Sequence, residues 1–332
     1  MNDEDSNDER LGCGPLRRLG IRHSDFRHSR QHNLAIEMSE NHHVSFSFRR
    51  VLAIATNTLI DLTRQRVFYF VLIFALSLIG SSAFMARFSF QQEFQILKDV
   101  ALGAMSIFTS LLAIIATARL IPQDIEDRTV YTILAKPVPR FEYVLGKLAG
   151  VLLLLAISTL IMSAMFLVVL YGREQTVLHE TARQMSSLPQ EQLDDALRAV
   201  RSSALNIDIL PGIGLIFVKA CLLVSLTLFV STFATTNIFT IVVMVVIYFI
   251  GHLQATARGY WLQQSNLGWL KRAFLALVAL IFPDLQAFNL VDDIVAGAAI
   301  PLALFLKIAG LGVSYIVIYT LLAAVVFYGK KL

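Results

Sequence analysis

Charged residues are scarce in this chain. They make up 16% of its 332 residues, whereas 56% are hydrophobic, and the mean hydropathy is +0.65. A soluble domain ordinarily has about a quarter of its residues charged. This much apolar surface does not fit inside one water-soluble core, so lipid must cover part of it. The composition therefore excludes a soluble globular protein and predicts an integral membrane protein.

Cysteine and the common catalytic motifs are also rare or missing. The two cysteines, Cys13 and Cys221, lie in regions that we do not expect to meet, and they have no zinc-type spacing. Gly146-Lys147 is followed by Leu148, so the chain has no phosphate-binding G-x-x-x-x-G-K-[S/T] loop, and it has no H-E-x-x-H or G-x-S-x-G motif. We expect a chain that is not an enzyme, with no catalytic residues, no metal, no cofactor of its own and no nucleic-acid partner.

Charge is sparse within the apolar segments themselves. Lys219 and Lys307 fall near the predicted ends of such segments, where a long side chain reaches the lipid headgroups. We therefore interpret both as interface anchors rather than as substrate contacts. Proton- and ion-coupled transporters usually keep carboxylates near the middle of the membrane, and none is evident here. This pattern disfavours a secondary transporter.

The N-terminal part of the chain is polar. Residues 1–45 lack periodicity and are predicted to form a disordered cytoplasmic tail. The tail holds five of the seven histidines, but no two share a supported helical face, so metal binding is the less favoured reading; a translation start at Met38 is a further hypothesis. Residues 47–66 have helical apolar spacing and are predicted to lie in the cytoplasmic membrane interface, the alternative being a cytosolic extension of the first span.

Six apolar segments are long enough to cross a hydrocarbon core of about 30 Å. They are predicted at 67–86, 100–121, 145–171, 213–233, 238–253 and 302–328, with Pro122 closing the second. Residues 273–282 are too short to cross and are stopped by Pro283, so they predict a re-entrant or broken segment before the last span. Residues 172–211 are predicted to form an external loop with one short helix capped by Ser187. The predicted fold is an all-α membrane domain over residues 46–332.

Basic residues set the predicted orientation. They gather before the first span, between the second and third spans, and at the C-terminus, whereas the loop 172–211 is net acidic. Lysine and arginine are enriched in the cytoplasmic loops of membrane proteins. Six spans with both termini in the cytoplasm satisfy this rule.

The most informative segment is the polar loop 121–147, between the second and third spans. A helix over 123–136 would have one apolar face. That face consists of Ile125, Thr129, Val130, Ile133 and Leu134. Pro137 disfavours helix at Lys136, so the helix is predicted to end there. A short, rigid helix fixed to two spans suits the transmission of force from a soluble partner, and a helix that lies on the lipid surface is the alternative.

This loop carries a resemblance to a known family. Asp124-x-Glu126-x-x-Thr129, followed by Leu134-x-Lys136-Pro137-x-x-Arg140 and Gly146-Lys147, resembles the signature of ABC-2 type permeases, the membrane subunits of ATP-driven exporters. It is similar in particular to the subgroup associated with maturation of multicopper enzymes such as nitrous oxide reductase. The six-span plan extends the likeness over 47–332. Arg128 is a departure, because many members have glycine there.

The resemblance implies a multi-pass subunit of the bacterial cytoplasmic (inner) membrane whose loop docks on a separate cytosolic ABC ATPase, which binds ATP and Mg²⁺. The implied coupling residues are Asp124, Glu126, Arg128, Thr129, Ile133, Leu134, Lys136, Pro137, Arg140, Gly146 and Lys147. The resemblance also implies a second permease copy or a paralogue around the pathway. An outer gate is implied near Phe282, Pro283 and Asp284.

Two other functions stay open. A membrane scaffold would recruit the ATPase without moving a substrate. A secondary transporter without a dedicated ATPase should show inverted repeats or charges at mid-membrane, and the sequence shows neither. The sequence selects no substrate and does not distinguish a homodimer from a heterodimer.

Overall fold

The computed structural model describes residues 47–86, 93–126, 139–185, 189–204, 209–262, 282–295 and 301–329. All regular elements in these ranges are helical. They are α2 (Phe48–Thr63), α3 (Arg66–Ala86), α4 (Glu93–Ala118), α5 (Leu120–Glu126), α7 (Arg140–Gln184), α8 (Gln190–Ala204), α9 (Ile209–Phe233), α10 (Asn237–Leu262), the 3₁₀ turn η1 (Gln286–Phe288), α12 (Val291–Val295) and α13 (Leu302–Gly329). The predicted tail 1–45 and most of the short apolar segment 273–282 lie outside the described residues.

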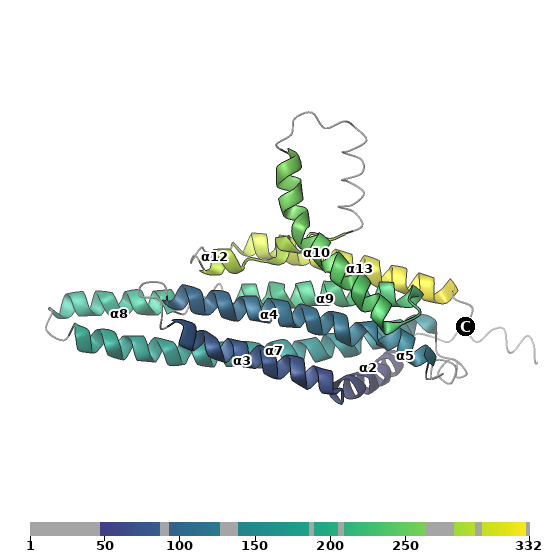
Figure 1. Ribbon diagram of the computed structural model, residues 1–332, viewed down its shortest axis with the longest axis horizontal. Helices are drawn as coiled ribbons and strands as arrows, with labels where there is room; N and C mark the ends of the chain where they lie inside the picture. Colours follow the sequence, from purple (N-terminus) through teal and green to yellow (C-terminus); the bar gives the residue numbers. More distant parts are fainter. Residues whose placement is uncertain are drawn as a thin grey trace, which may run out of the picture. The chain divides into compact units, whose positions relative to one another are not determined.

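Six helical segments are long and apolar enough to cross a membrane, which confirms the prediction of an all-α, multi-pass membrane protein (Figure 1). They are α3, α4 with α5, α7, α9, α10 and α13. Apolar runs become helices in lipid because a helix satisfies almost every backbone N–H and C=O group within itself.

Several of these helices are longer than predicted. The second begins at Glu93 rather than at 100, and the third continues to Gln184 rather than ending at 171. Pro122 does not end a helix: after a turn at Arg119 the chain forms α5, and Pro122 lies in its first turn. A proline costs little there, because N–H groups in the first turn have no partner within the helix.

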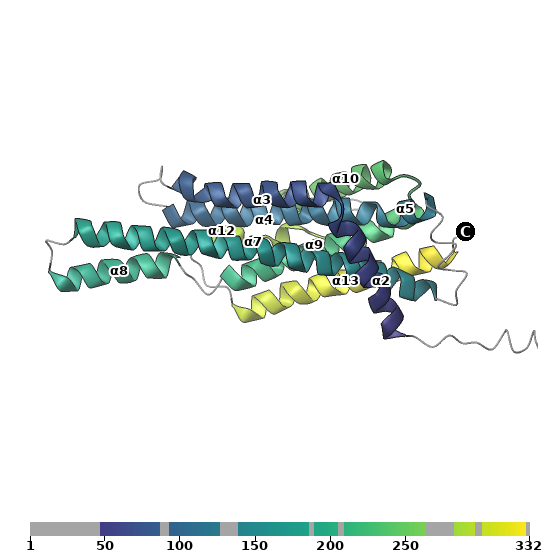
Figure 2. The ribbon, with the colours of Figure 1, turned by 90° about the horizontal axis from the view of Figure 1, so that it is seen from below.

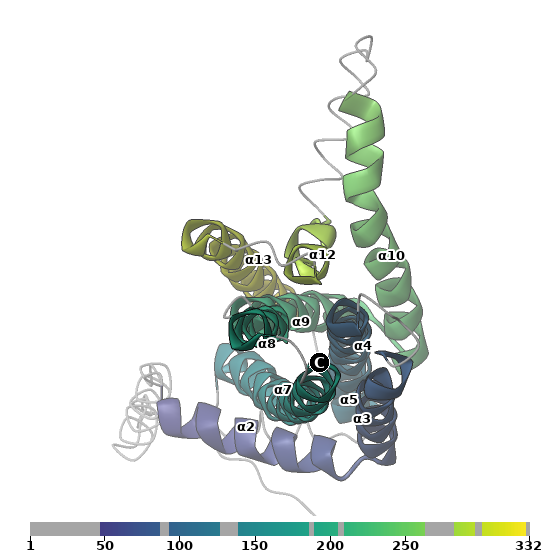
Figure 3. The ribbon, with the colours of Figure 1, turned by 90° about the vertical axis from the view of Figure 1, so that its left-hand side faces the viewer.

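Helix α9 lies at the centre of the bundle (Figure 3). It is apolar throughout, is buried along most of its length, and packs against α4, α7 and α13. A helix that is apolar on all sides is typical of a bundle interior. Other helices expose large apolar side chains, including Phe70 on α3, Ile238 on α10 and Val325 on α13. These outward faces are suited to contact with lipid.

The two ends of the bundle carry different elements (Figure 2). The α2 end has α2, α5, the start of α7 and the end of α13. The α8 end has α8, the end of α7 and the start of α9. Phe327 of α13 stacks on Tyr143 of α7 with ring centroids 5.5 Å apart, and the N–H of Ser47 donates to Glu142. The first and last described helices therefore meet at the same end, as an even number of crossings requires.

Helix α2 lies across the other helices at the α2 end (Figure 3) and packs against α7. Its buried residues are Val51, Ala55, Thr58 and Leu62. A Cβ atom added at Gly146 would lie 2.7 Å from Cβ of Ile54, and one at Gly150 would lie 2.8 Å from the carbonyl oxygen of Ala55. These glycines form a G-x-x-x-G pair, which lets membrane helices approach closely. The predicted amphipathic helix is confirmed, and one of its faces is bound to α7.

The segment after the third span, predicted as an external loop, is mostly helical. Because α7 continues to Gln184, α7 and α8 run side by side as a hairpin at the α8 end (Figure 2). Pro189 directly precedes α8, and its carbonyl oxygen accepts from the N–H groups of Gln192 and Leu193. The predicted cap, Ser187, lies outside the described residues.

Between α10 and α13 the chain folds back against the bundle. Residues 282–295, which include η1 and α12, pack against α4, α9 and α10. The N–H of Leu285 donates to the carbonyl oxygen of Gly251 at 3.1 Å, and a Cβ atom at Gly251 would lie 2.7 Å from the Leu285 side chain. Non-helical backbone is tolerated at membrane depth where protein buries it. The predicted re-entrant or broken segment, 273–282, ends where this region begins, and only Phe282 of it is among the described residues.

Candidate functional site

The residues predicted to contact an ATPase fall into two groups. Six lie outside the described residues: Arg128, Thr129, Ile133, Leu134, Lys136 and Pro137. Asp124 and Glu126 are at the end of α5, and Arg140, Gly146 and Lys147 are in the first turns of α7. The structure therefore describes the two flanks of the predicted docking loop.

An ion pair connects these flanks. Nζ of Lys147 lies 2.6 Å from Oδ2 of Asp124, and the hydroxyl of Tyr143 donates to the same oxygen. Tyr143 and Lys147 are four residues apart and so lie on the same face of α7. The Lys147 and Asp124 side chains are 8% and 18% exposed, so water and salt screen the pair only weakly.

A second ion pair connects α2 to α7. The Glu142 side chain, 1% exposed, accepts from Nε and Nη2 of Arg50 at 2.7 and 2.9 Å and from the N–H of Ser47 at 2.9 Å. Two parallel N–H···O bonds are typical of strong arginine–carboxylate pairs. The hydrogen bond with Glu142 raises the pKa of Arg50, so the guanidinium stays charged.

We call Arg50, Asp124, Glu142, Tyr143 and Lys147 the joint. Glu142 and Tyr143 are neighbours on α7, so the joint holds α2 and α5 to the same turns of that helix. The sequence resemblance predicted Asp124 and Lys147 but missed the other three residues. Arg50 and Glu142 are 92 positions apart, and no pattern in a single sequence pairs residues at that separation.

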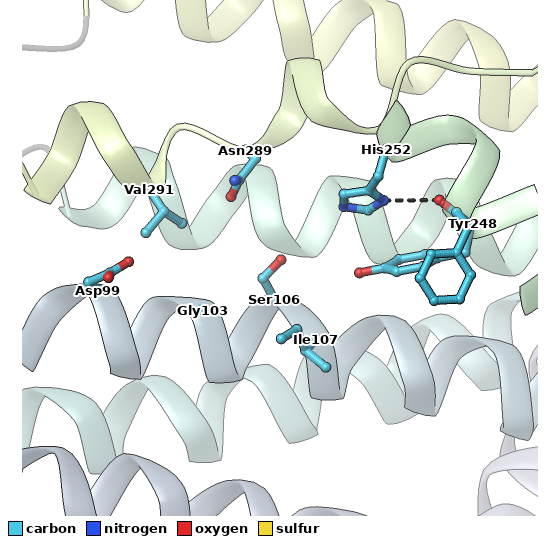
Figure 4. A pocket seen from close by; sticks show the side chains of 9 residues that line it. Asp99, Gly103, Ser106, Ile107, Tyr248, His252, Asn289 and Val291 are labelled. Atoms are coloured by element: carbon cyan, nitrogen blue, oxygen red, sulfur yellow. Dashed lines mark hydrogen bonds between the residues drawn. The ribbon is translucent and has the colours of Figure 1, made fainter. Parts of the chain in front are cut away.

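A second candidate site with several polar side chains lies beside α4 (Figure 4). A cavity of about 460 Å³ lies between α4, α10 and the η1–α12 segment. It is lined by Asp99, Gly103, Ser106, Ile107, Tyr248, Phe249, His252, Asn289 and Val291. Its volume falls within the range of about 300–1,000 Å³ that is usual for small-molecule sites. We refer to it below as the cavity.

Lys219 lies next to the cavity and not at a span end, so its predicted role as an interface anchor is wrong. It is about 15 Å along α9 from Ile209, where the helix begins. Its side chain is 1% exposed, and Nζ donates to Oγ of Ser106 at 2.5 Å. The sequence placed the start of this helix too late, at 213, and did not show that other helices cover the lysine. Lys307, by contrast, is exposed near the start of α13.

The residues predicted to form a gate lie in the segment that closes one side of the cavity. Pro283 is buried, and Phe282 and Asp284 are partly buried. Oδ1 of Asp284 accepts from the N–H groups of Gln286 and Ala287 at 3.1 and 3.4 Å, which stabilises the turn into η1. Their role as a gate stays a prediction.

Comparisons with known proteins do not identify the site. In the described ranges, no three His, Cys, Asp or Glu side chains are grouped so that they could hold a metal ion.

No protein-family model and no curated protein matched the chain. The resemblance to ABC-2 type permeases therefore stays a prediction from the residues of the loop.

Proposed function

We propose that this chain is the transmembrane subunit of an ATP-driven exporter whose energy comes from a separate cytosolic ATPase. The observation that carries the proposal is the ion pair between Asp124 and Lys147, which joins the two flanks of the predicted docking loop. A partner that pushed on the loop would move α5 and α7 together. Helix α5 follows α4, and both α4 and α7 pack against the central helix α9, so the displacement would reach the bundle interior.

The second ion pair extends this rigid unit to α2. Arg50 and Glu142 hold α2 to α7, and the close contacts at Gly146 and Gly150 fix the crossing. In this proposal the α2 end faces the bacterial cytoplasm, and α2 lies in the membrane interface with its arginines near lipid phosphates. The outward apolar faces of α10 and α13 would contact lipid and a second permease copy or paralogue.

A secondary transporter is the second candidate, because Lys219 places an ionisable group in the middle of a spanning helix. Such residues commonly mark substrate or ion pathways. The ATP-driven exporter remains the preferred function, since the joint lies beside the loop that resembles an ATPase-docking segment. A scaffold that recruits an ATPase without transport would use the same joint.

The test is to purify the tagged chain from its native membrane in mild detergent and to identify its partners by mass spectrometry. We expect a P-loop ATPase at near-equal stoichiometry. Glu126 is exposed at the end of α5, so Glu126→Lys should remove the partner and its stimulated hydrolysis while membrane insertion is retained. Glu191→Lys, which makes the same charge change on an exposed position of α8, is the matched control and should keep both.

The possible outcomes separate the candidate functions. A chain that is recovered alone, even after crosslinking through residue 128, would reject the ATPase-driven function. An ATPase that remains bound and stimulated in Glu126→Lys would reject the docking role of the loop. A bound ATPase that drives no transport in proteoliposomes would favour the scaffold.

A further inference from the structure

We propose that the cavity binds a small organic anion, with the anionic group at Ser106 and a short apolar body against Ile107 and Phe249. The site is formed by this chain alone, so it does not depend on whether an ATPase drives the protein. It is supported by a buried cation, by hydrogen-bond donors around the cavity, and by the position of the one carboxylate in its wall.

Lys219 provides the buried cation. Its side chain is 1% exposed, its recorded hydrogen bond is to Ser106, and no carboxylate in the described part of the chain forms an ion pair with it. A charge buried in a low-dielectric interior is costly unless another group compensates it. Ser106 lines the cavity, so an anion there would lie one hydroxyl group away from the ammonium and would provide that compensation.

The neighbouring polar groups are oriented for the same task. Oγ of Ser106 accepts a hydrogen bond from Nζ of Lys219. The hydroxyl hydrogen of Ser106 is therefore left to be donated toward the cavity. Nδ1 of His252 lies 3.0 Å from the carbonyl oxygen of Tyr248, which only accepts, so Nδ1 carries the hydrogen. Figure 4 shows the other ring nitrogen of His252, the hydroxyl of Ser106 and the Asn289 side chain directed toward the same space. With its hydrogen on Nδ1, a neutral His252 presents Nε2 to the cavity as an acceptor, so the donor beside Lys219 is the hydroxyl of Ser106.

The rest of the wall favours a monoanion with an apolar body. Ile107, Phe249 and Val291 supply apolar surface, and a few polar groups within an apolar wall are typical of ligand sites. Asp99 also lines the cavity, but it is seven residues before Ser106 and thus about 10 Å away along α4. Its carboxylate would repel a second negative charge on the ligand.

The depth of the cavity argues for a solute rather than a lipid headgroup. Ser106 is about 20 Å from the start of α4 at Glu93 and about 18 Å from its end at Ala118. It therefore lies near the middle of a hydrocarbon core of about 30 Å, whereas headgroups lie outside that core.

The test measures saturable binding of radiolabelled benzoate to the full chain in phosphatidylcholine nanodiscs. Benzyl alcohol has the same ring without the charge, and we expect it to compete at least about tenfold less well than unlabelled benzoate. Lys219→Met should weaken benzoate binding about tenfold or more, because it removes the cation behind Ser106. Lys307→Met removes the same charge from an exposed position on α13 and should leave binding unchanged.

A second variant blocks the cavity without changing its charge. A Cβ atom at Gly103 would meet no atom within 4 Å, so Gly103→Leu begins its side chain in open space at the cavity wall, and leucine has a higher helix propensity than glycine. We expect it to abolish benzoate binding while the thermal unfolding temperature is unchanged or higher. The proposal is overturned if wild-type protein shows no saturable binding, if benzyl alcohol competes as well as benzoate, or if Lys219→Met and Gly103→Leu both bind like wild type.

Discussion

Asp124 accepts from both Tyr143 and Lys147 through one carboxylate oxygen, between two helices that flank the predicted docking loop. Exposed ion pairs contribute only about 0–1 kcal/mol to stability. Breaking a fully buried pair by removing one partner costs about 3–5 kcal/mol, because the other charge is left uncompensated. The pair of Asp124 and Lys147 is largely but not fully buried, so its loss should cost an intermediate amount.

At this scale we predict the effect of Asp124→Asn, which keeps the shape of the side chain and removes its charge. The free energy of unfolding should fall by about 1–3 kcal/mol, because Lys147 loses its counter-charge. Lys147→Met should have a similar cost, and the double variant should cost less than the sum of the two. Unfolding of all four proteins by SDS in mixed micelles measures this coupling. Additive costs, within about 0.5 kcal/mol, would show that the two residues do not stabilise the joint together.

At the scale of helices, apolar runs identified every spanning helix in the described residues, because lipid forces such runs into helices. They did not identify the helix ends. Glu93 and Gln184 extend spans past the hydrocarbon core, where hydropathy no longer distinguishes a helix from a loop. The cavity and the burial of Lys219 also escaped prediction, because both depend on which helices become neighbours. The crossing of α2 over α7 could have been predicted from the sequence, because Gly146 and Gly150 have the G-x-x-x-G spacing of closely packed membrane helices. The sequence analysis did not use that spacing.

That crossing gives a prediction at the element scale. Gly150→Leu should push α2 away from α7, because even a Cβ atom at this position approaches the backbone of α2. We expect the free energy of unfolding to fall by about 1–3 kcal/mol through overpacking. A cysteine replacing Val51, which is 8% exposed, should react with maleimide much faster in the Gly150→Leu background.

Gly172→Leu is the control for this experiment, since it lies on the same helix and a Cβ atom there meets nothing within 4 Å. It should change neither stability nor the labelling of position 51. Equal labelling in the Gly150→Leu and Gly172→Leu proteins would mean that the glycine at 150 does not fix the position of α2.

At the scale of the whole molecule, charge is distributed unevenly between the two ends of the bundle. Among the described residues, basic residues are in excess at the α2 end: Arg49, Arg50, Arg64, Arg66, Arg119, Arg140 and Lys147 stand against Asp61, Asp124, Glu126 and Glu142. In the α7–α8 hairpin the basic residues are offset by acidic ones: Arg173, Arg183, Arg198 and Arg201 stand against Glu174, Glu180, Glu191, Asp194 and Asp195. Nearby, Arg173 also pairs with Glu93 at 2.6 Å, and Lys98 donates to the carbonyl oxygen of Ser203 at 2.8 Å. The positive-inside rule therefore favours the α2 end in the cytoplasm. The proposed function requires this orientation, because an ATPase in the cytoplasm reaches only that end.

Single cysteines in a background without Cys13 and Cys221 test the orientation. Thr56→Cys on α2, Tyr328→Cys at the end of α13 and Gln192→Cys on α8 all occupy exposed positions. A membrane-impermeant maleimide should label position 192 in right-side-out vesicles, and positions 56 and 328 only in inside-out vesicles. Labelling of 56 and 328 from opposite sides would contradict an even number of crossings. Labelling of both from outside would keep the six-span fold but leave the joint beyond the reach of a cytosolic ATPase, so the exporter proposal would fail while the anion site would stand.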